Sequence, residues 1–288
     1  MRDAAKIAAA IEILDSQLRQ HTPVKDAVRD WGKANRYAGS GDRAWITGLV
    51  LDALRHQSSV GHAMQDDSAR ALAFGTVARV WGLFVEEIDA MMEGDPHAPE
   101  TLTNAERSGL ERDISDAPLY IRGDFPQWLE GSFQRAFGDK AEEEAHELCS
   151  RAPVDLRVNE VQVGFDKAFK EVSSKLKTAE PSELAAMAIR IPQRDPRGKS
   201  AALSALLNNT GQIHAWDIDW RRLRAIWPRL KRAGAHNVQV QDAEEDKCLA
   251  DLVGKMDVVF CDAPCTGTGT WRRRPDAKWR LRERALET

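Results

Sequence analysis

An acid, a thiol and two glycines stand close together in one short stretch of the sequence. Asp262, Cys265, Gly267 and Gly269 follow the apolar run at residues 256–260, which predicts a buried strand. At the carboxyl end of such a strand, glycines let a substrate approach the backbone, while a carboxylate and a thiol face the crevice. The alternative is a cysteine that fills a small apolar space and glycines that form an ordinary turn.

A basic run with interleaved tryptophans follows. Residues 271–284 hold seven basic against two acidic residues, and residues 221–232 add six arginine or lysine residues. Arginines can neutralise phosphates and indoles can stack on unpaired bases, which predicts an RNA-binding segment. The alternative is a solvated helical face with the tryptophans packed beneath it. The residues that we assign to RNA binding are Arg272, Arg273, Arg274, Lys278 and Arg280.

Residues 262–280 together resemble one family motif. They read Asp-Ala-Pro-Cys-Thr-Gly-Thr-Gly, followed by a cluster of arginine, proline, aspartate, lysine and tryptophan. This string resembles the RsmB/Sun (Fmu) family of ribosomal-RNA cytosine-5 methyltransferases, which has serine where this chain has Thr266. The resemblance implies that Asp262 orients the cytosine and that Cys265 assists product release, so these two are the candidate catalytic residues.

The resemblance also implies an S-adenosylmethionine site in a Rossmann-like domain. Asp217 matches the acid that holds the ribose hydroxyls, a role that suits a carboxylate because it accepts two hydrogen bonds from a vicinal diol. Asp242 matches the acid beside the adenine, and Gly198, Lys199 and Arg222 complete the set of candidate cofactor residues. Either aspartate taken alone is also typical of a helix cap or a solvated turn.

Two departures from the family pattern bear on activity. In the first cofactor loop, here residues 190–200, Ile191 replaces an acid and Arg197 replaces a glycine, so a bulky side chain stands where the backbone must approach the cofactor. The family's nucleophile lies in a later Thr-Cys-Ser motif, and no cysteine follows Cys265 in this sequence. These departures favour a non-catalytic RNA-binding or regulatory descendant, or a truncated inactive remnant, over an active methyltransferase.

The composition is typical of a soluble globular protein without a global basic field. Hydrophobic residues make up 42% and charged residues 30%, and 41 basic against 45 acidic residues give a net charge of -4. The four cysteines include no C-x-x-C pair, which fits neither a disulfide framework nor a structural zinc site, so we expect no metal. No stretch approaches a membrane span, and we expect a cytoplasmic protein whose partner is RNA, ribosomal by resemblance.

The spacing of apolar residues predicts that residues 1–150 are helical. Stripes at helical spacing predict successive helices up to about residue 92, and a further helical stretch covers residues 125–149. Residues 84–116 hold ten acidic against two basic residues, which predicts a solvated connector with short helices. The resemblance makes this region a NusB-like RNA-binding domain.

From about residue 151 the pattern changes to strands that alternate with helices. Strands at residues 187–191, 212–217, 238–240 and 256–260 predict an α/β fold with a doubly wound parallel sheet. We assign residues 151–185 to a shortened linker subdomain and residues 186–288 to a partial, truncated Rossmann-like methyltransferase domain. The fourth strand is then an edge, which a protein partner covers unless the domain is an incomplete remnant.

Overall fold

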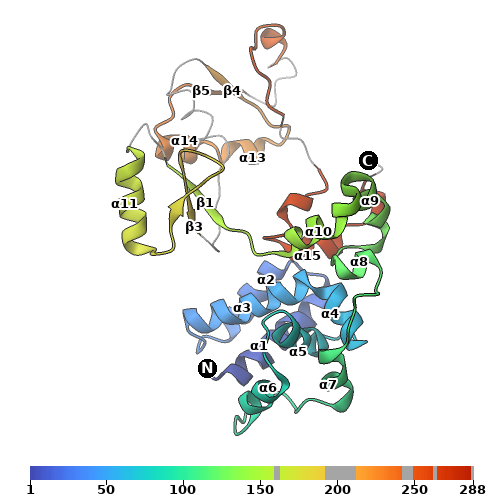
Figure 1. The fold of residues 1–288 in the computed structure, drawn as a ribbon. Coiled ribbons are helices and arrows are strands. Elements are labelled where there is room, and N and C mark those ends of the chain that lie inside the picture. Colours follow the sequence, from blue (N-terminus) through green and yellow to red (C-terminus); the bar gives the residue numbers. More distant parts are fainter. Residues whose placement is uncertain (159–162, 192–211, 242–248, 262–264, 287–288) are drawn as a thin grey trace. The chain divides into compact units, whose positions relative to one another are not determined.

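The chain folds into two compact units in the computed structural model (Figure 1). The helical unit comprises Met1–Arg151 and Pro264–Thr288, and the sheet unit comprises Ala152–Ala263. The residues that the structure describes are 1–158, 163–191, 212–241, 249–261 and 265–286. The last 25 residues therefore group with the helices, whereas the sequence pattern assigned them to one domain with residues 186–263.

The main core of the helical unit lies among its first five helices. Helix α1 packs against α3 and α5, and buries Ile7 and Leu14 against Leu49, Leu72 and Phe74. Periodic apolar residues face this core, and the prediction that the region is helical is confirmed. The bounds are α1 Asp3–Gln20, α2 Val24–Ala34, α3 Ser40–Arg55, α4 Gln57–Met64 and α5 Ala69–Arg79.

The acidic stretch contains two short helices, α6 (Val85–Met92) and α7 (Asn104–Glu111). A capping box starts α7, because the backbone N–H of Glu106 donates to Thr103 Oγ1 and that of Thr103 donates to Glu106 Oε2. Leu102 belongs to the main core, as do Ile88 and Leu110. The prediction of short helices is confirmed, but this stretch is a packed part of the unit rather than a solvated connector.

A second, smaller core forms around Phe125 and Phe133, whose stacked rings have centroids 4.2 Å apart. The elements that surround it are α8 Leu119–Arg122, η1 Gln127–Leu129, α9 Glu130–Phe137, η2 Gly138–Lys140 and α10 Ala141–Cys149. Its remaining buried members are Leu129, Ala141, Ala145 and, from far along the chain, Trp271. The end of the described chain thus supplies part of this core.

The sheet unit begins with a three-stranded antiparallel sheet in the order β1-β3-β2. Strand β3 pairs with β1 in the register Val154↔Ile191, and with β2 on its other side. The bounds are β1 Val154–Arg157, α11 Phe165–Lys175, β2 Glu180–Pro181 and β3 Ala188–Ile191. The prediction that β3 opens a parallel Rossmann-like sheet is therefore wrong, because both of its neighbours run antiparallel to it.

A parallel pair follows, with β4 (Ile213–Ala215) beside β5 (Val238–Val240). Helices α13 (Trp220–Arg224) and α14 (Trp227–Ala233) lie between these strands in sequence, so this part has the predicted β-α-β order. Residues 256–260 form no strand, and Val258, Val259 and Phe260 are exposed. Among the described residues the predicted doubly wound sheet thus reduces to two parallel strands.

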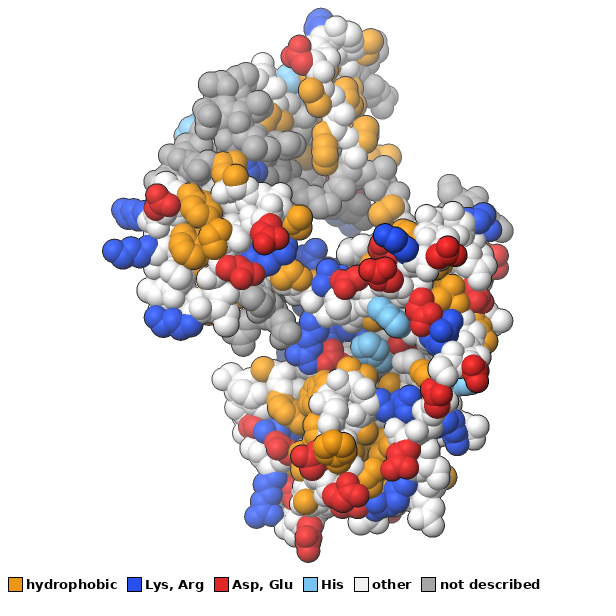
Figure 2. All heavy atoms as spheres, viewed as in Figure 1, with side chains coloured by type: hydrophobic (Ala, Val, Ile, Leu, Met, Phe, Trp, Pro, Cys, Tyr) orange, Lys and Arg blue, Asp and Glu red, His pale blue; other side chains and the backbone are white. Residues whose placement is uncertain are grey.

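The described chain ends with three short turns of helix, η4 Thr268–Thr270, α15 Pro275–Arg280 and η5 Glu283–Leu286. Within the described ranges, no helix combines the length and the apolar character needed to cross a membrane. On the face shown in Figure 2, acidic and basic side chains are interspersed over the helical unit. A charged binding surface must therefore be local.

Candidate functional site

The cysteine motif enters the helical unit through a tight turn. Cys265 is exposed, and Gly267 has a φ of +73°, a left-handed conformation that favours glycine over residues with a Cβ. The backbone N–H and the hydroxyl of Thr270 both donate to the Gly267 carbonyl, at 2.8 and 2.7 Å. The turn therefore explains why the motif has glycine at position 267.

Trp271 directly follows this turn. It is 1% exposed and packs in the second core with Phe125, Phe133 and Ala145. Its indole Nε1 has no hydrogen-bond partner among the described residues, so apolar packing holds the ring. The tryptophan that the sequence offered for base stacking is a core residue.

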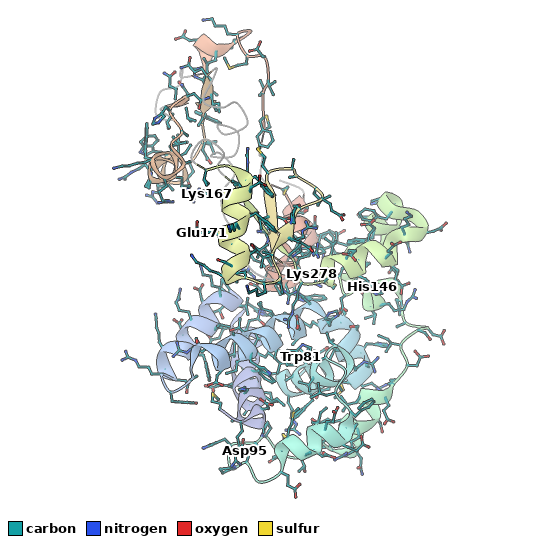
Figure 3. The ribbon with its side chains drawn as sticks, turned by 60° about the vertical axis from the view of Figure 1, so that its left-hand side comes forward. Trp81, Asp95, His146, Lys167, Glu171 and Lys278 are labelled. Atoms are coloured by element: carbon teal, nitrogen blue, oxygen red, sulfur yellow. The ribbon has the colours of Figure 1, made fainter. Side chains whose placement is uncertain are left out.

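Lys278 is the most unusual residue of the segment, since it is only 1% exposed (Figure 3). Its ammonium group donates to the Arg55 carbonyl at 2.8 Å and lies 3.5 Å from Cys149 Sγ. The charge lies 4.8 Å from the centroid of the Trp279 ring, within cation–π range. Burial raises the pKa of the Cys149 thiol, although the neighbouring Lys278 opposes that rise.

Helix α15 supplies groups of opposite charge to the ends of two other helices. At the C-terminus of α3, Lys278 donates to the Arg55 carbonyl and Trp279 Nε1 donates to the Leu54 carbonyl at 2.6 Å. At the N-terminus of α2, Asp276 Oδ2 accepts the backbone N–H of Val24 at 3.3 Å. These terminal groups have no partner within their own helices. The helix dipole favours the cation of Lys278 at the C-terminus of α3 and the carboxylate of Asp276 at the N-terminus of α2.

A buried charge network connects the segment to α3. Arg55 donates through Nε and Nη2 to the Arg272 carbonyl, at 3.2 and 2.6 Å, and through Nη1 to Asp52 at 2.7 Å. Asp52 also accepts hydrogen bonds from Arg151 and from Trp81 Nε1. Burial would raise the pKa of Asp52, but the hydrogen bonds from Arg151 and Trp81 outweigh it and hold that pKa below the ordinary value.

These contacts change the assignment of the basic run. For Lys278 the structure corrects the expectation of a phosphate contact, because the ammonium group is buried and bonded within the chain. Arg272 is half-buried and donates to the carbonyls of Ser150 and Arg151, and Arg280 is paired with Asp276 at 2.8 Å. Arg273 and Arg274 are exposed. Their assignment to RNA binding stays a prediction.

The candidate cofactor residues are not brought together within the described part of the chain. Asp217 follows β4 at its carboxyl end, as predicted, but its Oδ1 accepts the backbone N–H of Asp219 at 2.8 Å and so caps a turn. Arg222 lies in α13, and its side chain is not described. The remaining assigned residues, Gly198, Lys199, Asp242 and the catalytic Asp262, lie outside the described residues.

The described residues include only part of the expected S-adenosylmethionine site. A doubly wound sheet binds its ligand beyond the carboxyl ends of several parallel strands. Among the described residues only β4 and β5 pair in parallel. Of the expected set, Asp217 alone is described at the end of a parallel strand, where its Oδ1 accepts the Asp219 backbone N–H.

Two family models match adjacent parts of the chain. Residues 194–288 match the model described as 16S rRNA methyltransferase RsmB/F, and residues 125–196 match the RsmF/B-like ferredoxin-like domain. The chain belongs to the RsmB/F family of S-adenosylmethionine-dependent rRNA cytosine-5 methyltransferases. In this RsmB/F chain, β1, α11, β2 and β3 all fall in the ferredoxin-like match, which agrees with their antiparallel pairing.

Curated relatives support the family. Ribosomal RNA small subunit methyltransferase B of Photorhabdus laumondii is 26% identical over 200 residues, which is 55% of this chain and 46% of that protein. The tRNA (cytosine(72)-C(5))-methyltransferase of Pyrococcus horikoshii is 39% identical over 83 residues, covering 27% of this chain and 21% of the relative. The 25S rRNA (cytosine-C(5))-methyltransferase nop2 of Schizosaccharomyces pombe is 34% identical, covering 32% and 15%. The chain thus spans less than half of the length of each of these relatives.

The fold is shared with a solved structure. The crystal structure of PH0851 aligns with all of this chain and 80% of its own, with a TM-score of 0.62 and 18% identity.

The ferredoxin-like match also corrects the comparison of Ile191 with a cofactor acid. Ile191 is 7% exposed as a strand residue of that domain, and it lies outside the methyltransferase match, which begins at residue 194.

Sequence reasoning missed the partners of the C-terminal segment. Asp52, Arg55 and Cys149 surround Lys278 and Arg272 but were not assigned to any site. They are more than a hundred residues distant in sequence, so local spacing gives no signal for them.

Sequence reasoning also missed the cations of α2. Lys25, Arg29 and Lys33 recur there at every fourth position, and this spacing can be read from the sequence.

Proposed function

We propose that this chain binds ribosomal RNA as a member of the cytosine-5 methyltransferase family and does not by itself transfer a methyl group. The observation that supports RNA binding is the exposure of Arg273 and Arg274 within the basic segment 271–284. Buried neighbours fix the backbone on both sides of these arginines. Two cations held in this way can meet phosphates with little loss of conformational freedom.

We base the absence of methyl transfer on the first cofactor loop. The replacement of a loop glycine by Arg197 opposes the close backbone approach that the cofactor needs. We also propose that the helical bundle is a NusB-like RNA-binding domain. The chain would then contact RNA through both this bundle and the C-terminal basic segment.

A second candidate function is methyl transfer by the same chain. The intact string from Asp262 to Gly269 favours it, with Asp262 orienting a cytosine and the exposed Cys265 as the thiol. Cys261 is exposed as well, and residues 256–260 before it form no strand. A working thiol needs thiolate character, which neighbouring arginines can promote.

The experiment that tests RNA binding is a salt titration of the affinity for a fluorescent single-stranded rRNA fragment. Each phosphate contact gives a log-log slope of about -0.7, so replacing Arg273 and Arg274 by alanine is expected to flatten the slope by about 1.4. The matched control replaces the exposed Lys167 and Lys170 of α11, which removes the same charge. Equal slopes for the arginine variant and the wild type would overturn the assignment of these two residues.

A further inference from the structure

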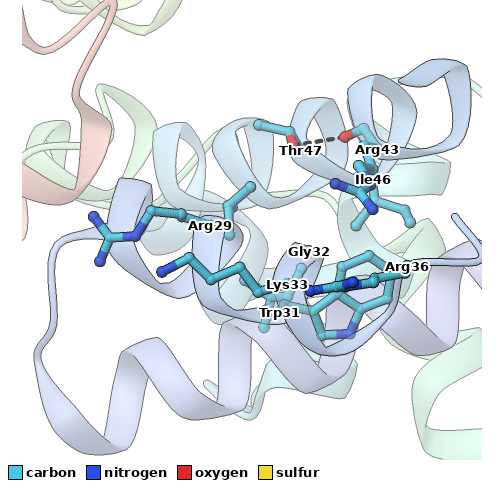
Figure 4. Close-up of a pocket in the computed structure, with 10 residues that line it drawn as sticks. Arg29, Trp31, Gly32, Lys33, Arg36, Arg43, Ile46 and Thr47 are labelled. Atoms are coloured by element: carbon cyan, nitrogen blue, oxygen red, sulfur yellow. Dashed lines mark hydrogen bonds between the residues drawn. The ribbon is translucent and has the colours of Figure 1, made fainter. Parts of the chain in front are cut away.

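A cavity of about 430 Å³ opens between the first three helices of the helical unit. Its apolar floor comprises Ile13 of α1, Val28 and Trp31 of α2, and Ile46 of α3. Trp31 and Ile46 are labelled in Figure 4. This volume lies within the range of small-molecule sites. The cavity belongs to neither the cysteine motif nor the cofactor residues.

Four cations and no carboxylate line this cavity. Arg29 and Lys33 come from α2, Arg36 from the loop that follows it, and Arg43 from α3 (Figure 4). The chain as a whole has more acids than bases, so this ring concentrates positive charge locally. A ligand with both an apolar part and a negative charge matches this combination.

The floor and the inner wall are fixed before any ligand arrives. Trp31 is 8% exposed, and its Nε1 donates to Glu12 Oε2 at 2.9 Å, which orients the indole. Arg43 Nε donates to the Ala38 carbonyl at 2.8 Å. The side chain of Arg43 crosses over Gly32, where an added Cβ would lie 3.4 Å from Nη1.

The outer cations are held only loosely. Arg29 pairs with Asp26 and Asp30, and Lys33 lies 3.5 Å from Asp30, all with well-exposed side chains. Exposed ion pairs of this kind contribute little free energy, so phosphates can replace the aspartates as partners. Arg36 makes no ion pair with the described residues.

We propose that this cavity holds one unpaired nucleotide of RNA, with its base against Val28, Trp31 and Ile46. Its phosphates lie against Arg29, Lys33 and Arg36, while Arg43 closes the inner wall. A flat base suits the apolar floor, and flanking phosphates suit the cations at the rim. The inference rests on the proposed RNA binding and adds to it a site and a preference for single strands.

The test compares two double variants of the full chain for binding to a fluorescent single-stranded RNA. Replacing Lys33 and Arg36 by alanine is expected to raise Kd about tenfold and to flatten the salt slope by about 1.4. The control replaces Arg19 and Lys25, two exposed cations outside the cavity that remove the same charge. We expect the control to change Kd less than about twofold.

A second measurement locates the RNA directly. RNA that carries photoreactive 4-thiouridine is crosslinked to the chain, and the modified peptide is identified by mass spectrometry. We expect crosslinks to the peptides of α2 and the loop after it, and we expect duplex RNA to compete poorly. Equal loss of affinity in both double variants, no crosslink to α2 or the loop after it, or equal competition by duplex would overturn the nucleotide site while leaving RNA binding intact. No binding by the wild type, with the RNA shown to be intact, would overturn both proposals.

Discussion

The ammonium group of Lys278 donates a hydrogen bond of 2.8 Å to the carbonyl oxygen of Arg55, 223 residues earlier in the chain. This bond is buried, and it supplies a cation to the C-terminal end of α3. The same helix that carries Lys278 presents Asp276 to the N-terminal end of α2. The short helix α15 therefore provides hydrogen-bond partners for one end of α2 and one end of α3.

Replacing Lys278 by alanine is expected to destabilise the chain by about 2 to 4 kcal/mol. The substitution leaves the Arg55 carbonyl without this partner and opens a cavity beside Trp279. Urea unfolding followed by circular dichroism measures the effect. Arg274→Ala, an exposed position on the same segment, is expected to cost less than about 0.5 kcal/mol. Similar midpoints for both variants would show that Lys278 does not hold the segment.

The lowered pKa of Asp52 predicts that the folded chain loses stability in acid. Its pKa is held below the ordinary 3.8, so the carboxylate stabilises the fold above the unfolded pKa, and this contribution is lost as pH falls through the lowered folded value. Asp52→Asn lacks this titration. The difference in unfolding free energy between wild type and Asp52→Asn is therefore expected to shrink from about pH 5 to about pH 2. A constant difference across this range would contradict the assignment.

S-adenosylmethionine is expected to bind weakly or not at all. Arg197 stands where a glycine is needed for the backbone to approach the cofactor closely. Isothermal titration calorimetry on the full chain gives the measurement. A dissociation constant in the low micromolar range that Asp217→Ala abolishes would restore the methyltransferase as the better proposal.

RNA that contains 5-fluorocytosine is expected to form no covalent adduct with this chain. In the family the nucleophile adds to C6 of cytosine, and fluorine at C5 traps the adduct because it cannot be eliminated. Gel electrophoresis under denaturing conditions detects such a complex. An adduct that requires the cofactor and disappears in Cys265→Ser would establish catalysis and refute the non-catalytic proposal.

Local sequence was enough to predict the helices of the first unit. Ile7 and Leu14 recur at helical spacing along α1, and Ile46, Leu49 and Ala53 do so along α3, so one face of each helix had to be buried. The same reasoning predicted the β-α-β order from β4 to β5. In each case, the information lies within a few residues.

Strand partners and buried charges could not be predicted in this way. The pattern of Ala188–Ile191 gives a strand, but its antiparallel direction is set by β1, more than thirty residues earlier. Lys278 sits in a run of arginines that is typical of a solvated surface. The cost of burying its ammonium group is offset by the hydrogen bond to the Arg55 carbonyl, and no local sequence pattern predicts that contact.

The helical unit is interrupted in the chain, since Pro264–Thr288 completes a structure whose other residues end at Arg151. At about 5 to 20 residues per second, roughly 6 to 26 s separate the synthesis of residue 151 from that of residue 280. During that interval the nascent bundle lacks Trp271, and the ends of α2 and α3 lack Asp276 and Lys278. A ribosome-bound intermediate therefore exposes the apolar surface that Trp271 later covers. During these seconds, chaperones or neighbouring nascent chains can bind that surface.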